Sequence, residues 1–132
     1  ATTHDLQDLN NLVTPEMNLK ETISKIKGRK IIYTNAPKSY TDRILKISNI
    51  YEMFDEIFTI EDSDFTPKPN QGSMGNFLKK YNIKDGVFID DIKENLKTAK
   101  NFGLSTIWIT DEMSHHSFID RKIEKVSDLL AL

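Results

Sequence analysis

The stretch Gly86-Val-Phe-Ile-Asp-Asp91 decides the fold of this chain. Its first four residues, Gly86 to Ile89, are typical of a short buried strand, and a helix is predicted directly after it, over Ile92 to Phe102. Asp90 and Asp91 therefore fall at the carboxyl end of a strand. Open α/β sheets bind their ligands at that end, so the two acids are the first candidates for a functional site.

The adjacent carboxylates have two interpretations. Two such groups repel each other and lose hydration at the mouth of a strand, and a hard cation with oxygen ligands, such as magnesium, would offset that cost. Alternatively, Asp91 is the N-cap of the following helix and Asp90 is a solvated loop acid. The pair alone favours the metal only slightly, and residues upstream strengthen that interpretation.

Composition limits the class of protein before any motif is considered. The 132 residues fit one domain, and the net charge of −2, with acids and bases interleaved, predicts neither a nucleic-acid partner nor a membrane partner. Cysteine is absent, so disulfides and thiolate metal sites are excluded. No apolar stretch has transmembrane length and the first residues do not resemble a signal peptide, so the cytoplasm is the expected compartment.

Short apolar runs alternate with amphipathic segments along the chain. This alternation predicts an α/β fold with right-handed crossovers and a mostly parallel sheet. The expected strands are 30–34, 56–60, 86–90 and 105–110, with a short extended piece at 118–119. The expected helices are 17–26, 39–49, one ending at 81, 92–102, and one starting at 125.

Polar groups suited to a phosphoryl ligand follow three of these strands. Thr34 and Asn35 come after the first, Lys68 stands between two prolines after the second, and Asp90 and Asp91 come after the third. A hydroxyl with neighbouring N–H groups, a fixed ammonium and a metal-binding acid pair supply positioning and charge neutralisation. Each signal is weak alone, because threonine is common in turns and most loop lysines are solvated. The prolines hold both flanks of Lys68 extended, which aims its side chain.

In order and spacing this set resembles the haloacid dehalogenase superfamily of phosphohydrolases. The resemblance is carried by three motifs, Ile31–Ala36, Thr66–Pro69 and Phe88–Asn95, and it continues through Ala99–Trp108. It implies a three-layer Rossmann-like core formed by residues 1–132 as a single domain.

The resemblance also implies roles for the candidate residues and a magnesium cofactor. Thr34 and the N–H of Asn35 would hold phosphoryl oxygens, and Lys68 would stabilise the nucleophile and the transition state. Asp90, helped by Asp91, would hold magnesium. The implied reaction is phosphomonoester hydrolysis through an aspartyl-phosphate.

Within the superfamily the chain is most similar to pyrimidine 5′-nucleotidase-like members. Three segments carry this similarity: Thr34–Ala36, Tyr40–Leu45 and Tyr51–Asp55. The implied substrate is a small phosphorylated molecule, specifically a nucleoside monophosphate.

One departure from the family pattern is large. The family's first motif is Asp-x-Asp-x-Thr at the end of a central strand, and its first Asp is the nucleophile, but nothing of this kind precedes Thr34. Asp5 and Asp8 lie in a polar segment with no strand ahead of them. The segment Asp62–Thr66 fits the pattern literally, but it lies in the wrong chain order.

The expectation is therefore a chain equivalent to the C-terminal two-thirds of a phosphatase. It would lack the central nucleophile strand and most of the helical cap, save a cap return segment at Ala1–Pro15. A fragment, a split-gene product and a decayed enzyme all fit this expectation, and the chain alone should be inactive. The alternative function is a non-catalytic remnant that binds a partner or a small anion.

Loss of the central strand leaves two strand edges to be paired. We expect direct pairing of Lys30–Thr34 with Gly86–Asp90, with a strand from another chain, or self-association through exposed edges, as the alternative. Lys68 is expected to be a loop cation with little core packing. Trp108 is expected to be a packing residue.

Three further polar residues are assigned from their positions in the chain. His115 and His116 are expected in a solvated loop, since an adjacent pair of histidines is a poor metal signature. Asn95 follows Asp91 by one helical turn and either orients that acid or lies on the surface.

Overall fold

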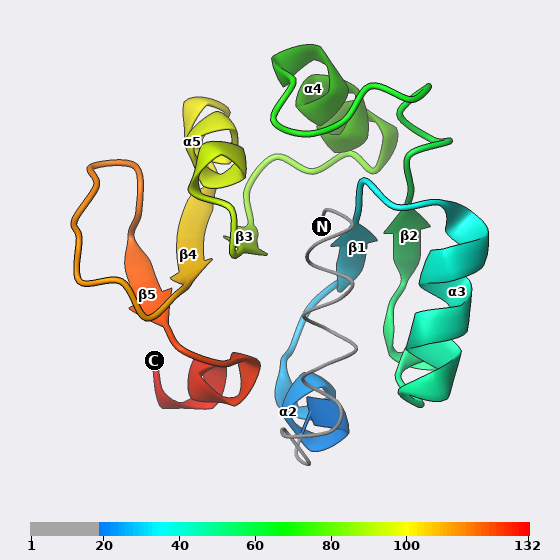
Figure 1. Cartoon of the computed structure of the whole chain (residues 1–132), viewed down its shortest axis with the longest axis horizontal. Helices are drawn as coiled ribbons and strands as arrows, with labels where there is room; N and C mark the ends of the chain where they lie inside the picture. Colours follow the sequence, from blue (N-terminus) through cyan, green and yellow to red (C-terminus); the bar gives the residue numbers. More distant parts are fainter. Residues whose placement is uncertain (1–18) are drawn as a thin grey trace.

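The computed structural model describes residues 19–132 and shows strands that alternate with helices (Figure 1). The elements in chain order are α2 (Leu19–Lys25), β1 (Ile31–Tyr33), α3 (Lys38–Ile47), the 3₁₀ helix η1 (Tyr51–Met53), β2 (Glu56–Phe58), α4 (Gln71–Lys80), β3 (Val87–Asp90), α5 (Lys93–Asn101), β4 (Ser105–Ile109), β5 (Arg121–Ile123) and the 3₁₀ helix η2 (Val126–Ala131). The four strands that the sequence predicted are present as β1, β2, β3 and β4, and their ends lie within two residues of the expected ends. None of the helices in residues 19–132 is long and apolar enough to cross a membrane.

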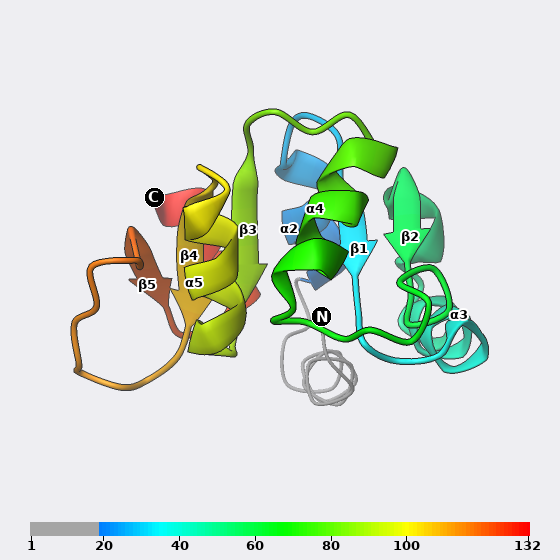
Figure 2. The same cartoon turned by 90° about the horizontal axis from the view of Figure 1, so that it is seen from above.

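All strand pairs among these residues are parallel, which confirms the predicted α/β class. They form two sheets, β1-β2 and β3-β4-β5. In the first, Tyr33 lies opposite Phe58, and in the second, Asp90 lies opposite Trp108. The carboxyl ends of β1 and β3 are thus at the same end of the structure, because both strands run in the same direction (Figure 2).

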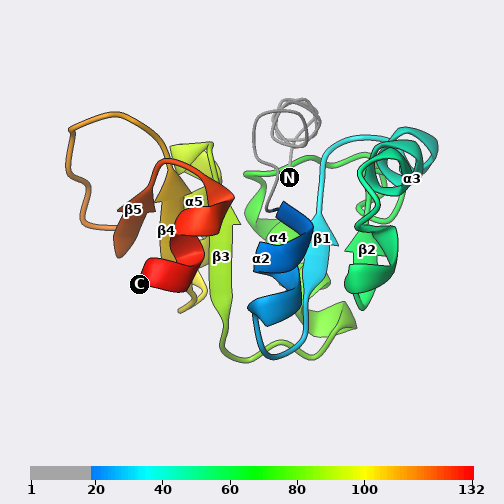
Figure 3. The same ribbon diagram turned by 90° about the horizontal axis from the view of Figure 1, so that it is seen from below.

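Helices cover both faces of the strands, in the three-layer arrangement. Helices α4 and α5 lie on one face (Figure 2), while α2 and η2 lie on the other (Figure 3). The core under α4 and α5 includes Tyr33 and Phe58 from one sheet and Phe88 and Trp108 from the other. The second core joins α2 and α3 through Leu19, Ile23, Leu45 and Ile50.

Direct pairing of β1 with β3 was expected from the sequence, and this prediction is wrong. Within residues 19–132 the two strands are neighbours in different sheets, with no hydrogen-bonded ladder between them. We call the boundary between β1 and β3 the seam.

The N–H of Thr34 donates to the Phe58 carbonyl at 2.9 Å. The carbonyl of Tyr33, one residue earlier, therefore points to the opposite edge of β1, toward the seam. The Lys68 ammonium donates to that carbonyl at 2.9 Å, and a side chain thus occupies the place of a strand partner.

The two faces of the seam differ. The core under α4 and α5 crosses it, because Tyr33 of β1 and Phe88 of β3 share that core. On the opposite face, Val87 and Ile89 of β3 are 58% and 38% exposed. Next to the seam itself, side chains join the two sheets on the α4 and α5 face, where Lys68 also lies, while on the opposite face Val126 of η2 packs against the second core.

Candidate active site

Thr34 and Asn35 lie directly after β1. Thr34 is buried, its N–H continues the pairing with β2, and its hydroxyl oxygen accepts the N–H of Ala36 at 3.0 Å. The Asn35 side chain binds the backbone of Lys68 twice: Oδ1 accepts its N–H at 2.9 Å, and Nδ2 donates to its carbonyl at 3.3 Å. Asn35 thereby ties the loop that carries Lys68 to the end of β1, a contact that the sequence did not predict.

Lys68 is a buried residue, which corrects the expectation of a loop cation with little packing. Its side chain is 0% exposed, although its backbone belongs to the loop between β2 and α4. The ammonium donates to the Tyr33 carbonyl at 2.9 Å and to Asp90 Oδ2 at 3.1 Å. Lys68 therefore links the last residue of β1 to the last residue of β3, across the seam.

Burial and pairing act against each other at this ion pair. Burial lowers the pKa of the Lys68 ammonium, and the neighbouring Asp90 carboxylate offsets only part of this effect. At Asp90 burial favours the protonated form, yet the pKa of the carboxyl lies below its ordinary value, and the Lys68 ammonium and the N–H of Ile92 are among the groups that lower it. Asp90 is therefore an anion at neutral pH.

Three groups hold the Asp90 carboxylate in one orientation. Oδ1 accepts the N–H of Ile92 at 2.8 Å, while Oδ2 accepts Lys68 Nζ and also Asn95 Nδ2 at 3.2 Å. Asn95 is 1% exposed, so it does not lie on the surface, and its side chain orients Asp90. The structural alternative for the acid pair is thus wrong on both counts: Asp90 is buried and not a solvated loop acid, and the N-cap of α5 is Ile92 and not Asp91.

Asp91 is positioned through its backbone. The indole Nε1 of Trp108, in β4, donates to the Asp91 carbonyl at 2.9 Å. Trp108 is 3% exposed and belongs to the core under α4 and α5. The residue thus packs, as expected, and also fixes the acid that follows β3.

The oxygen atoms at this point fit magnesium in type. Asp90 and Asp91 supply carboxylates, and Asn95 adds an amide oxygen, Oδ1, that is buried and has no hydrogen-bond partner within residues 19–132. Buried acceptors are rarely left without a hydrogen-bond donor, and a water molecule held by a metal ion would supply one here. No group of three or more acids, histidines or cysteines gathers in the described part of the chain, so waters or a phosphate would complete the octahedral shell.

The literal Asp-x-Asp-x-Thr match at Asp62–Thr66 is a structural turn. Asp62 Oδ2 accepts the N–H of Thr59 at 2.8 Å and its hydroxyl at 3.1 Å, and Oδ1 lies 3.7 Å from Lys80 Nζ. Oδ2 thus closes the turn after β2, while Oδ1 pairs with the last residue of α4. These contacts explain the acid at this position without a catalytic role.

The histidine pair splits into two environments. His115 is exposed, as expected for a solvated loop. His116 is not fully solvated, because its ring lies 5.5 Å from that of Trp108 and is stacked on Phe118 at 5.2 Å. The loop after β4 therefore packs on the indole that fixes Asp91.

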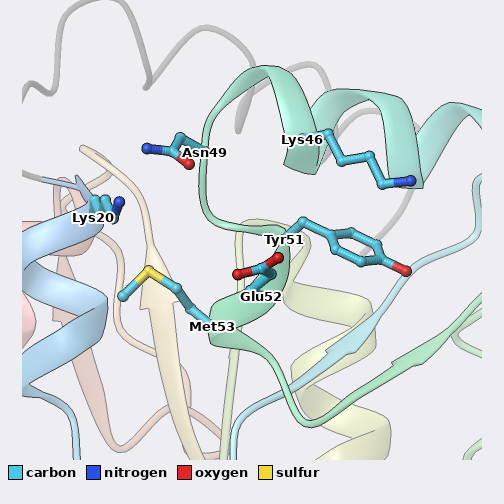
Figure 4. Close-up of a pocket in the computed structure, with 6 residues that line it drawn as sticks. All are labelled: Lys20, Lys46, Asn49, Tyr51, Glu52 and Met53. Carbon is cyan, nitrogen blue, oxygen red and sulfur yellow. The ribbon is translucent and has the colours of Figure 1, made fainter.

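A surface pocket of about 440 Å³ lies elsewhere (Figure 4). Its lining comes from α2, α3, the turn after α3 and η1: Lys20, Lys46, Asn49, Tyr51, Glu52 and Met53. It contains none of the residues that the sequence assigned to phosphate or magnesium. The candidate site is thus the polar cluster at the carboxyl ends of β1 and β3.

The contact between Trp108 and Asp91 leads to the first prediction. Trp108→Phe should lower the free energy of unfolding by about 1–3 kcal/mol, since it removes one hydrogen bond and leaves a small void. It should also weaken magnesium binding, because the Asp91 carbonyl loses its fixed partner. Urea unfolding and a magnesium titration followed by NMR measure the two effects. The control is Phe58→Leu, which removes core volume beneath the other sheet and should lower stability without weakening magnesium binding. Equal weakening of magnesium binding by both variants would contradict the role of Trp108 in fixing Asp91.

Comparison with known proteins shows which family the chain resembles. The family model of haloacid dehalogenase-like hydrolases matches residues 2–109. The HAD-hydrolase YfnB from Bacillus subtilis, solved bound to magnesium, has a TM-score of 0.76 and 21% identity, over 87% of this chain and 54% of that one.

Two phosphatase structures are also similar. A predicted phosphoglycolate phosphatase from Haemophilus somnus 129PT has a TM-score of 0.72 and 20% identity, over 86% of this chain and 55% of that one. A HAD phosphatase from Thermococcus onnurineus has a TM-score of 0.69 and 21% identity, over 84% of this chain and 53% of that one. At these identities the likeness establishes the fold.

The chain spans about half the length of the solved structures that it matches. No curated protein sequence matches it. The family model nevertheless covers most of the 132 residues, including all three motifs at the ends of β1 and β3 and in the loop of Lys68. The chain belongs to the haloacid dehalogenase-like hydrolase family.

Proposed function

We propose that this chain forms the phosphoryl-binding and magnesium-binding part of a phosphomonoester hydrolase. The observation that carries the proposal is the buried ion pair between Lys68 and Asp90, 3.1 Å apart, next to Thr34 at the end of β1. A buried pair costs desolvation energy, and hydrophobic residues of similar size would serve stability as well or better. Retention of charge at this place therefore supports a chemical role.

The residues of the site divide into two sets by chemistry. Thr34 and the N–H of Asn35 bind phosphoryl oxygens. The Thr34 hydroxyl oxygen already accepts the N–H of Ala36, so its own O–H remains available to donate to a phosphoryl oxygen. Lys68 neutralises charge that develops on the transferring group. Asp90, Asp91 and the Asn95 amide oxygen would hold magnesium, which supplies charge neutralisation at the phosphate when bound.

The covalent step requires a carboxylate that the described residues do not supply. We propose that it comes from an Asp-x-Asp segment outside residues 19–132. An oxygen of its first Asp attacks phosphorus, the phosphorus–oxygen ester bond breaks, and the second Asp of the segment donates a proton to the departing alcohol and later takes one from the attacking water. Water then cleaves the acyl phosphate, releases inorganic phosphate and restores the carboxylate.

The proposed substrate class is the nucleoside monophosphates. Its support is the likeness to pyrimidine 5′-nucleotidase-like sequences at Thr34–Ala36, Tyr40–Leu45 and Tyr51–Asp55. The last two segments lie in α3 and around η1. The two similar phosphatases and the magnesium-bound YfnB structure support the coarser proposal of a magnesium-dependent phosphatase.

The chain of 132 residues should release no p-nitrophenol above background from p-nitrophenyl phosphate with magnesium. The covalent step needs a nucleophile, and neither Asp62 nor another acid of the described site is placed to replace it. The assay is run beside Asp62→Asn. Turnover by the unmodified chain that disappears in Asp62→Asn would show that the turn after β2 is the nucleophile site and that its structural assignment is wrong.

The full reaction is tested on a polypeptide in which an Asp-x-Asp strand precedes this chain. A panel of nucleoside monophosphates, sugar phosphates and 2-chloropropionate is assayed with and without magnesium, and Thr34→Val serves as the binding-site variant. Phosphate release that is highest for nucleoside monophosphates and falls in Thr34→Val supports the proposal. Halide release without phosphatase activity would contradict it, and so would phosphatase activity that Thr34→Val leaves unchanged.

A further inference from the structure

The Lys68 ammonium has aromatic neighbours in addition to the Tyr33 carbonyl and the Asp90 carboxylate. Its Nζ lies 4.9 Å from the centre of the Tyr33 ring and 5.5 Å from the centre of the Phe88 ring. The two rings come from β1 and β3, on opposite sides of the seam. Their centres are 6.2 Å apart with planes at 89°, so the ammonium meets two differently oriented aromatic surfaces.

Tyr33 is held in place from several directions. Its ring packs against Phe77 at 4.3 Å and against Phe58 at 5.1 Å, and the residue is 5% exposed. Its hydroxyl forms a 2.8 Å hydrogen bond with Ser73 Oγ, in the first turn of α4, and the N–H of Ser73 donates to the N-cap Asn70. A change of the Tyr33 χ1 angle that swings the ring away from the ammonium would therefore break this buried hydrogen bond.

We propose that Tyr33 and Phe88 form an aromatic cage that positions the Lys68 ammonium at the seam. An aromatic face attracts a cation through its quadrupole, and this attraction is stronger where water is excluded. The ring does not accept an N–H proton as a carboxylate does, so the cage restrains the ammonium without competing for its hydrogen-bond donors. Tyr33 thus positions Lys68 in two ways: its carbonyl accepts a hydrogen bond from the ammonium, and its ring faces the same ammonium.

The inference concerns how the cation is held, so it does not depend on which reaction the site performs. Its readout is spectroscopic. Ring currents shift protons that lie over an aromatic face upfield, and the ε-methylene protons of Lys68 should resonate upfield of those of the exposed lysines. The Lys68 signals in the NMR spectrum of the chain are identified by their loss in Lys68→Met.

Variants separate the cage from general core packing. Tyr33→Leu and Phe88→Leu should each move the Lys68 ε-proton signals toward those of exposed lysines. Leu104→Ala is the matched control, because Leu104 is 4% exposed in the same core, yet the rings that face the ammonium are those of Tyr33 and Phe88. It should lower stability and leave most of the upfield shift in place.

Tyr33→Phe covers the case in which the leucine variants do not fold. It keeps the ring and removes only the hydroxyl that binds Ser73, so the Lys68 signals should remain upfield. Loss of the upfield shift in Tyr33→Phe would overturn the cage. So would Lys68 signals that Tyr33→Leu and Phe88→Leu leave unchanged, or that Leu104→Ala moves as far as they do.

Discussion

Lys68→Met is expected to lower the free energy of unfolding by about 3–5 kcal/mol, the range found when one partner of a buried ion pair is removed. The Lys68 and Asp90 side chains are 0% and 1% exposed, so the carboxylate that remains cannot recover its hydration. Methionine keeps most of the length of the lysine, which limits the loss of packing. Folded domains are commonly stable by only 5–15 kcal/mol, so this loss is a large part of the total. Urea unfolding followed by circular dichroism at neutral pH measures it.

An exposed ion pair provides the control for this experiment. Lys100 and Asp120 lie 2.6 Å apart, closer than Lys68 and Asp90, but their side chains are 32% and 42% exposed. Water and salt screen such a pair, so Lys100→Met should change stability by only about 0–1 kcal/mol. Similar effects of the two lysine substitutions would contradict the importance of burial at the seam.

A double-mutant cycle tests whether the loss belongs to the pair. Asp90→Asn alone leaves the ammonium without its carboxylate, and Lys68→Met alone leaves the carboxylate without its ammonium. The double variant has neither buried charge, so its loss of stability should be clearly smaller than the sum of the two single losses. Additive losses would show that the two residues stabilise the fold independently.

The elements of the fold were predictable because their signals are local. The apolar runs at Ile31–Tyr33 and Val87–Ile89 predict strands whatever they pack against, and the alternation with helices predicts parallel pairing. The start of strand β5 was placed three residues too early, at 118, and the strand was not identified as part of a sheet. Two of its three residues are Arg121 and Lys122, and a basic edge strand lacks the apolar pattern on which strand prediction depends.

The partners of the site residues were less predictable, because they depend on how distant segments pack. The strand-end rule indicated that Lys68 and Asp90 would be near each other, and the structure does bring them into contact. The complete burial of Lys68 was missed, since its flanking prolines indicated only a constrained loop. The hydrogen bond from Trp108 to Asp91 was also missed, because an indole N–H in an apolar strand is consistent with packing alone. The register of β3 against β4 decides that contact.

Acid should destabilise the fold through Asp90 more than through any exposed carboxylate. The pKa of Asp90 is held below that of an unfolded aspartate, about 3.9, so the folded state binds the proton less readily than the unfolded state. The contribution of Asp90 to stability is therefore fully present above about pH 4, and it is lost as the pH falls through the folded pKa. Each pKa unit of difference between the two states corresponds to about 1.4 kcal/mol.

Salt separates Asp90 from the surface acids whose pKa is also lowered. Asp120 owes its shift chiefly to the exposed Lys100, and at 1 M salt the Debye length is only about 3 Å, so that contribution should weaken. The buried pair at the seam is screened much less. Urea unfolding between pH 2 and pH 6 in 1 M sodium chloride should therefore retain a steep loss of stability in acid. The loss should be much smaller in Asp90→Asn and almost unchanged in Asp120→Asn, and the reverse order would show that the acid sensitivity resides on the surface and not at the seam.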